Sequence, residues 1–132
     1  MNEHSALTEG VYLILVSLLQ PRHGYAVMQN IEALTNGRVV MGAGTLYGAI
    51  NNLLEKKWIA AANKVESRKK EYVITPNGRE TLQYEIMRLG ELVQIGLACM
   101  ENSAKAELPR EKTAREARSF CTSLEEGSNH AN

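Results

Sequence analysis

The sequence predicts a mostly α-helical protein with a small β-hairpin, and three observations support this fold class. Apolar residues recur at helical spacing in three segments before residue 57. Two short β-forming runs, 58–61 and 71–75, are joined by a polar, charged loop, which is typical of a hairpin. A long helical pattern follows, in which apolar residues recur with spacings that alternate between four and three residues, as in a coiled coil.

The chain has 132 residues, the usual size of one domain with an appended segment. We expect residues 1–76 to form that domain, 77–102 a terminal helix, and 103–132 an acidic, polar tail with one short helix at most and a disordered end. The longest apolar run is well short of the roughly 20 residues that span a membrane. The first residues lack the basic region of a signal peptide. The two cysteines form no motif, which suits a cytoplasmic protein.

The three predicted helices are separated by turn signals. The first covers about residues 7–19 with Thr8 or Ser5 as its N-cap, and its apolar residues surround the axis, so we expect it to be the most buried helix. A turn at 20–24 leads to the second helix, about 25–34, which Asn36-Gly37 terminates. The third begins near Gly44 or Thr45 and ends at the two lysines before the hairpin.

The third helix has two unlike faces. Its apolar stripe consists of Leu46, Ile50, Leu53 and Leu54. Its other face is small and polar, with Thr45, Gly48, Asn51 and Asn52. Such a face can lie close against a large partner, and Asn amides can pair with base edges. The alternative is the half-exposed helix of an ordinary small bundle.

Charge is unevenly distributed, although the 15 basic and 15 acidic residues cancel. Positions 22–79 contain nine basic and four acidic residues, whereas both ends of the chain have a negative net charge. Such asymmetry indicates an anionic partner, with chance segregation as the alternative. Within the hairpin loop, at about 62–70, the basic residues are Lys64, Arg68, Lys69 and Lys70.

Three helices followed by a basic hairpin is the order of a winged helix-turn-helix domain, in which the third helix enters the major groove of double-stranded DNA and the wing reaches the backbone. Recognition helices meet bases through their first residues. The candidates for DNA contact on this helix are therefore Gly44, Thr45, Tyr47 and Asn51. The alternative is a winged-helix module that binds protein, because a fold does not determine its function.

The terminal helix is predicted over about residues 77–100. Its heptad seam consists of Leu82, Ile86, Leu89, Val93, Gly96 and Met100. About 24 residues extend roughly 36 Å, which is too long for the preceding domain to cover. We therefore expect a homodimer with two half-sites on a palindromic operator. A seam buried within its own chain is the alternative.

An ordered set of motifs resembles the PadR family of transcriptional regulators. The set comprises His23-Gly24-Tyr25, Gly44-Thr45-Leu46-Tyr47, residues 53–59, residues 68–75 and Gly78, and the resemblance covers about residues 7–85. The resemblance implies a recognition helix, a wing and a terminal dimerisation helix, as in the subfamily with one short terminal helix. It also makes Tyr25, Thr45, Tyr47 and Lys69 the first candidates for DNA contact.

The chain departs from the family pattern in two places. Many members have Pro-Ser-Pro and Pro where this chain has Met41-Gly42-Ala43 and Gly48. The resemblance therefore does not imply an operator sequence for this chain. Some members stack flat aromatic drugs on a Trp of the terminal helix, whereas the single Trp here, Trp58, is expected in the core. By resemblance we expect a repressor that a small hydrophobic or aromatic effector releases; a regulator without an effector is the alternative.

Neither catalysis nor a cofactor is expected. His23 lies in a turn, where it is expected to cap or bond the second helix, and the other histidines lie near the chain ends. The cysteines and histidines lack the spacing of metal ligands. The glycines near residue 44 do not follow a strand as a phosphate-binding loop requires.

Overall fold

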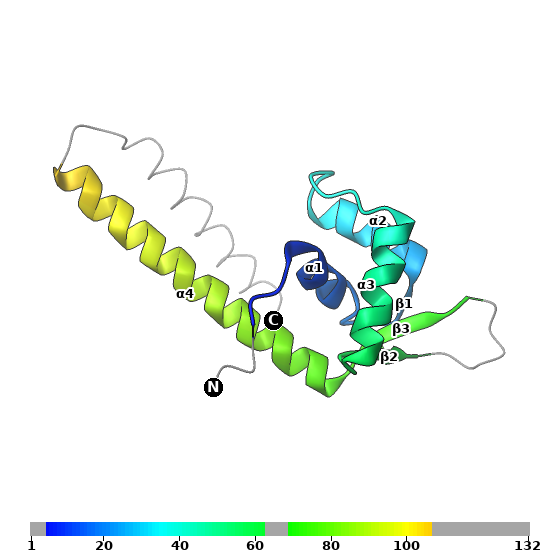
Figure 1. The fold of residues 1–132 in the computed structure, drawn as a ribbon. Helices are drawn as coiled ribbons and strands as arrows, with labels where there is room; N and C mark the ends of the chain where they lie inside the picture. Colours follow the sequence, from blue (N-terminus) through cyan, green and yellow to red (C-terminus); the bar gives the residue numbers. More distant parts are fainter. Residues whose placement is uncertain (1–4, 63–68, 107–132) are drawn as a thin grey trace. The chain divides into compact units, whose positions relative to one another are not determined.

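The computed structural model describes residues 5–62 and 69–106. Its elements are, in chain order, α1 (Glu9–Ser17), β1 (Arg22–His23), α2 (Gly24–Leu34), α3 (Ala43–Glu55), β2 (Ile59–Ala61), β3 (Glu71–Ile74) and α4 (Pro76–Ala106) (Figure 1). The chain divides into two compact units, residues 1–86 and 87–132, and α4 runs from the first into the second. The predicted fold class is confirmed. The predicted end of the terminal helix at residue 102 is wrong, because α4 continues to Ala106; the rest of the predicted tail, 107–132, lies outside the described residues.

An aliphatic core holds the first unit together. Glu9 is the only exposed residue of α1, which confirms that α1 is deeply buried, as its all-round apolar pattern predicted. The buried hydrophobic residues are Leu13, Ile14, Leu15, Leu18, Val27, Ile31, Leu46, Ile50, Leu53, Ile59, Tyr72, Ile74 and Leu82. Trp58 is half-buried and packs against this core, in agreement with the expectation for the single tryptophan.

The sheet contains one strand more than the sequence predicted. Its order is β1-β3-β2, with β3 antiparallel to both neighbours. The hairpin of β2 and β3 is confirmed, and Ile59 pairs with Ile74. Arg22 and His23 were predicted as part of a turn, but they pair with Tyr72 and Glu71 of β3. Two residues are too few to show the alternating pattern of a strand, so the sequence cannot indicate β1. Arg22 and His23 form a strand because they pair with the edge of β3.

The helix ends use the caps that the sequence predicted. The Val11 N–H donates to Thr8 Oγ1 at 3.2 Å at the start of α1, and the Gly78 N–H donates to Thr75 Oγ1 at 3.0 Å at the start of α4. After α2, Asn36 and Gly37 have φ values of 52° and 80°, which a turn with left-handed residues requires. These local signals therefore determine where the helices begin and end.

The first turns of α4 belong to the core of the first unit. A Cβ at Gly78 would lie 2.8 Å from the carbonyl carbon of Trp58, so glycine allows α4 to start close against that backbone. Leu82 is only 2% exposed and is covered by its own chain. The sequence predicted Leu82 as part of the heptad seam, which is wrong, because the core of the first unit already buries this side chain; the exposed seam begins at Ile86.

Candidate nucleic-acid interface

One face of α3 is exposed, and it is the small, polar face that the sequence indicated. Leu46, Ile50 and Leu53 point into the core. The exposed residues of the other face are Gly44, Thr45, Tyr47, Gly48, Asn51 and Asn52. Added Cβ atoms at Gly44 and Gly48 would meet nothing within 4 Å. The fold therefore leaves open space beside the first two turns of α3.

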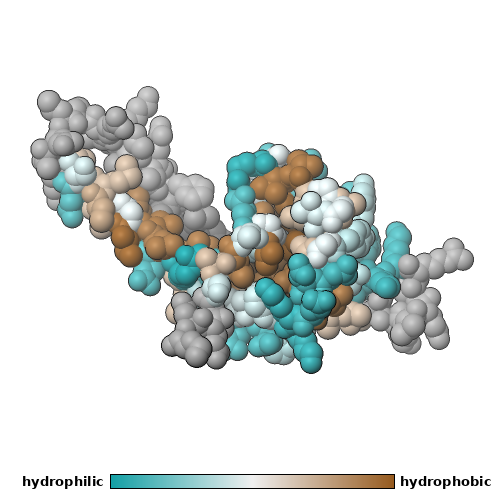
Figure 2. Space-filling view, in the orientation of Figure 1, coloured by the Kyte–Doolittle hydropathy of each residue, from teal (hydrophilic) through white to brown (hydrophobic). Residues whose placement is uncertain are grey.

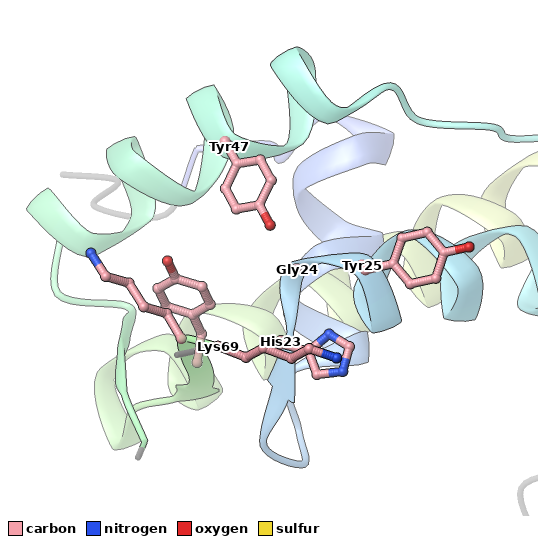
Figure 3. Close-up of a pocket in the computed structure, with 7 residues that line it drawn as sticks. His23, Gly24, Tyr25, Tyr47 and Lys69 are labelled. Atoms are coloured by element: carbon pink, nitrogen blue, oxygen red, sulfur yellow. The ribbon is translucent and has the colours of Figure 1, made fainter. Parts of the chain in front are cut away.

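A hollow of about 540 Å³ lies beside this face and joins three segments that are distant in the sequence. Its lining residues are His23, Gly24, Tyr25, Tyr47, Lys69, Lys70 and Tyr72. They come from the junction of β1 and α2, the second turn of α3, and the segment that leads from the wing into β3 (Figure 3). Two ammonium groups and three phenol rings in one concave surface suit a phosphate and the sugar or base attached to it.

The hollow brings together four of the predicted contact residues and leaves others outside it. Tyr25, Tyr47, Lys69 and Lys70 line it, and the two tyrosines are 61% and 44% exposed. Gly44, Thr45 and Asn51 lie on the exposed face of α3 but do not line the hollow. Lys64 and Arg68 lie outside the described residues. The interface thus has two parts, the α3 face and the hollow.

The sequence did not single out His23 and Tyr72 as site residues. His23 Nδ1 accepts a hydrogen bond from the Ala26 N–H at 3.3 Å, which confirms the expectation that this histidine caps the second helix. In the neutral ring, that bond places the proton on Nε2, which makes Nε2 a donor. Tyr72 is mostly buried; this burial, with Tyr47 nearby, raises the pKa of its hydroxyl, which stays protonated at neutral pH. The available signal was that both belong to the motifs shared with the PadR family, His23 in His23-Gly24-Tyr25 and Tyr72 in residues 68–75.

A second exposed surface runs along α4, where apolar side chains stand in solvent (Figure 2). Of the predicted seam, Ile86, Leu89, Val93 and Met100 are 36–48% exposed, and Gly96 is also exposed. Together with Leu92 and Ile95, they form an apolar surface far larger than a single exposed residue. Such a surface is typical of an interface with another protein.

The described residues contain neither a cluster of metal-binding side chains nor a membrane span. Groups of three or more histidine, cysteine or acidic side chains that could hold a metal ion do not occur among them. Likewise, the described helices include none that is long and apolar enough to cross a membrane.

Comparison with known proteins identifies the family. The model of the transcriptional regulator PadR-like family matches residues 13–84, just over half of the chain. An uncharacterized 37.1 kDa protein in a transposon of Streptomyces fradiae is 36% identical over 81 residues, which are 61% of this chain but only 23% of that protein.

Solved structures support the same fold. A PadR family regulator from Eggerthella lenta is 25% identical, with a TM-score of 0.53 over 68% of this chain and 79% of that one. A transcriptional regulator from Clostridium thermocellum is 24% identical, with a TM-score of 0.57 over 64% and 86%. The chain therefore belongs to the PadR-like family of transcriptional regulators.

Proposed function

We propose that this chain is a dimeric repressor that binds operator DNA through α3 and the wing. The observation that carries the proposal is the hollow beside the exposed face of α3, whose lining includes Lys69, Lys70, Tyr25 and Tyr47. A recognition helix needs a face that approaches bases and flanking cations that neutralise phosphates. The first unit supplies both on adjacent surfaces.

The two parts of the interface have different tasks. Gly44 and Thr45 at the start of α3, and Asn51 one to two turns later, face the bases of the major groove. The residues of the hollow hold backbone phosphates, which set the position of the helix without carrying sequence information. The sequence predicts further phosphate contacts for Lys64 and Arg68, which lie outside the described residues.

The dimer forms through the exposed apolar surface of α4. Ile86, Leu89, Val93, Gly96 and Met100 are separated by three and four residues in turn, so one continuous seam faces a second copy of α4. Two α3 helices related by the dimer axis then read half-sites of a palindromic operator about 34–36 Å apart. A dimer bound across a promoter excludes the polymerase.

A small hydrophobic or aromatic effector releases the repressor by binding in the dimer interface beside α4. Gly90 and Gly96 support this, since added Cβ atoms there would meet nothing within 4 Å, which leaves room for a ligand between two helices. An effector that binds better to one spacing of the α3 helices shifts the dimer toward the DNA-free state. Unchanged DNA affinity with every ligand that binds the dimer would contradict release and leave a regulator without an effector.

Fluorescence anisotropy with labelled duplex DNA tests DNA binding. We expect binding at low salt that weakens steeply as salt rises, because each phosphate contact releases counterions. The variant with Lys69→Ala and Lys70→Ala should lower the slope of log K against log salt by about 2. Arg79→Ala removes an exposed charge that does not line the hollow, and it should change the slope less. A folded dimer that binds no duplex at any salt would favour the protein-binding winged-helix module.

A further inference from the structure

The start of α2 lies unusually close to a side chain of α3. A Cβ at Gly24 would lie 2.7 Å from Tyr47 Cζ and 3.0 Å from Tyr47 Cε1, and nearer still to the hydroxyl oxygen. A side chain at position 24 and the Tyr47 ring therefore cannot occupy their places together. Figure 3 shows the Tyr47 hydroxyl directed toward Gly24.

The ring of Tyr47 requires this glycine, whereas the backbone conformation does not. Gly37 is the glycine with a positive φ in the described part of the chain, and Gly24 is an ordinary first residue of a helix. Other helical glycines differ: Cβ atoms at Gly48 and Gly90 would meet nothing within 4 Å, and a Cβ at Gly78 would meet the backbone of Trp58 and not an aromatic ring. The absence of a side chain at position 24 thus serves a specific contact with Tyr47.

This contact decides where the hydroxyl of Tyr47 points. Tyr47 lies on the exposed face of α3 and is 44% exposed, so its ring has space to extend toward solvent beside Thr45 and Asn51. Packing over Gly24 directs the ring into the hollow instead, where Lys69 and Lys70 supply positive charge. A phenol hydroxyl is a common donor to phosphate oxygens.

We propose that Gly24 is a positioning residue of the DNA interface: it holds the Tyr47 hydroxyl in the hollow, where that hydroxyl donates to a backbone phosphate instead of reading a base. This inference rests on the proposed function of α3 as the DNA-binding helix. Tyr47 then contributes to the affinity for any duplex, and Gly44, Thr45 and Asn51 on the exposed face of α3 discriminate between sequences.

A double-mutant cycle between positions 24 and 47 tests the proposal. Fluorescence anisotropy would measure the affinity of Gly24→Ala, Tyr47→Ala and the double variant for duplex DNA. We expect each single variant to weaken binding by about tenfold, the scale of one hydrogen bond to a charged group. The double variant should bind within about twofold of Tyr47→Ala, because the added methyl then has no ring to displace.

Tyr47→Phe separates a phosphate contact from a base contact. The loss of the hydroxyl should weaken binding to AT-rich and GC-rich duplexes by the same factor, because phosphates carry no sequence information. A loss confined to one of the two duplexes would overturn the phosphate assignment. Ala33→Ser serves as the control, since it adds one small group at an exposed position of α2 that does not line the hollow, and it should bind DNA as the wild type does.

The remaining outcomes are equally decisive. If Gly24→Ala binds DNA as tightly as the wild type, the positioning role is wrong and the proposed function stands. The same holds if Gly24→Ala weakens binding by the same factor in the presence and in the absence of the Tyr47 ring. A wild type that binds no duplex DNA would overturn both. If Gly24→Ala folds poorly by circular dichroism, the double variant decides: restored folding and Tyr47→Ala-like binding support the proposal, and continued misfolding refutes it.

Discussion

The first unit and the far part of α4 place their apolar side chains in opposite environments. In the first unit, side chains such as Ile14, Leu15 and Ile50 are completely buried. Between residues 87 and 104, all side chains are exposed or only partly covered; Met87, Leu92 and Ile95 are 49–65% exposed (Figure 2). The two regions therefore differ in where they obtain their stabilisation.

Burial of apolar surface contributes about 25 cal/mol per Å². The first unit gains this free energy from contacts within one chain. The far part of α4 gains little until a second surface covers it, so its stability should depend on protein concentration. We therefore expect substitutions in the core of the first unit to affect folding, substitutions in the seam to affect assembly, and substitutions at the exposed surface to have small effects.

The largest effect is expected in the core of the first unit. Ile50→Ala removes a completely buried side chain and should lower the free energy of unfolding by about 2–5 kcal/mol. Met87→Ala removes a side chain that is 65% exposed and should change it by less than about 0.5 kcal/mol. Urea titration followed by the fluorescence of Trp58 measures both values. Similar losses for the two variants would contradict the comparison.

A smaller effect, on assembly and not on folding, is expected in the seam. Val93→Glu places a carboxylate where the proposed dimer excludes water, and it should raise the dimer dissociation constant by at least about a hundredfold, or roughly 2.7 kcal/mol. Gln94→Glu adds the same charge one residue away, off the seam, and should leave the dimer intact. Analytical ultracentrifugation measures both. A Val93→Glu variant that remains as dimeric as the Gln94→Glu control would refute the seam.

The smallest effect is expected at the surface of the first unit. Arg38 Nη2 lies 2.6 Å from Glu9 Oε2, and this hydrogen bond holds the pKa of Glu9 below its usual 4.5. A lowered native pKa stabilises the fold above pH 4.5, and the effect is lost as the pH falls through the native pKa. Because both side chains are more than half exposed, the effect should be small and sensitive to salt.

Thermal unfolding of wild type and Glu9→Gln at pH 7 and pH 3 measures this effect. The wild type should have the higher midpoint at pH 7, and the difference should shrink at pH 3. Glu80→Gln, at an exposed position on α4, is the control for removal of a charge alone. A difference between wild type and Glu9→Gln that is the same at both pH values would mean that the ion pair is not its cause.

Much of the fold and part of the interface were predictable. The caps Thr8 and Thr75, and the turn at Asn36 and Gly37, depend on residues three or four positions apart, so the sequence contains them in readable form. The strand β1 was missed because its two residues become a strand only beside β3. His23 and Tyr72 were missed as site residues because the hollow forms only when three segments meet.

The kinds and order of the elements, the basic wing and the heptad spacing of the last helix are readable in the amino-acid sequence, because they follow from local geometry along the chain. Three further features depend on how the elements pack: Leu82 is covered by the core, Arg22 pairs with Tyr72, and Tyr47 packs over Gly24. Each joins residues more than 20 positions apart or depends on the packing of several elements, and the repeat of a single helix or strand carries no information about such contacts.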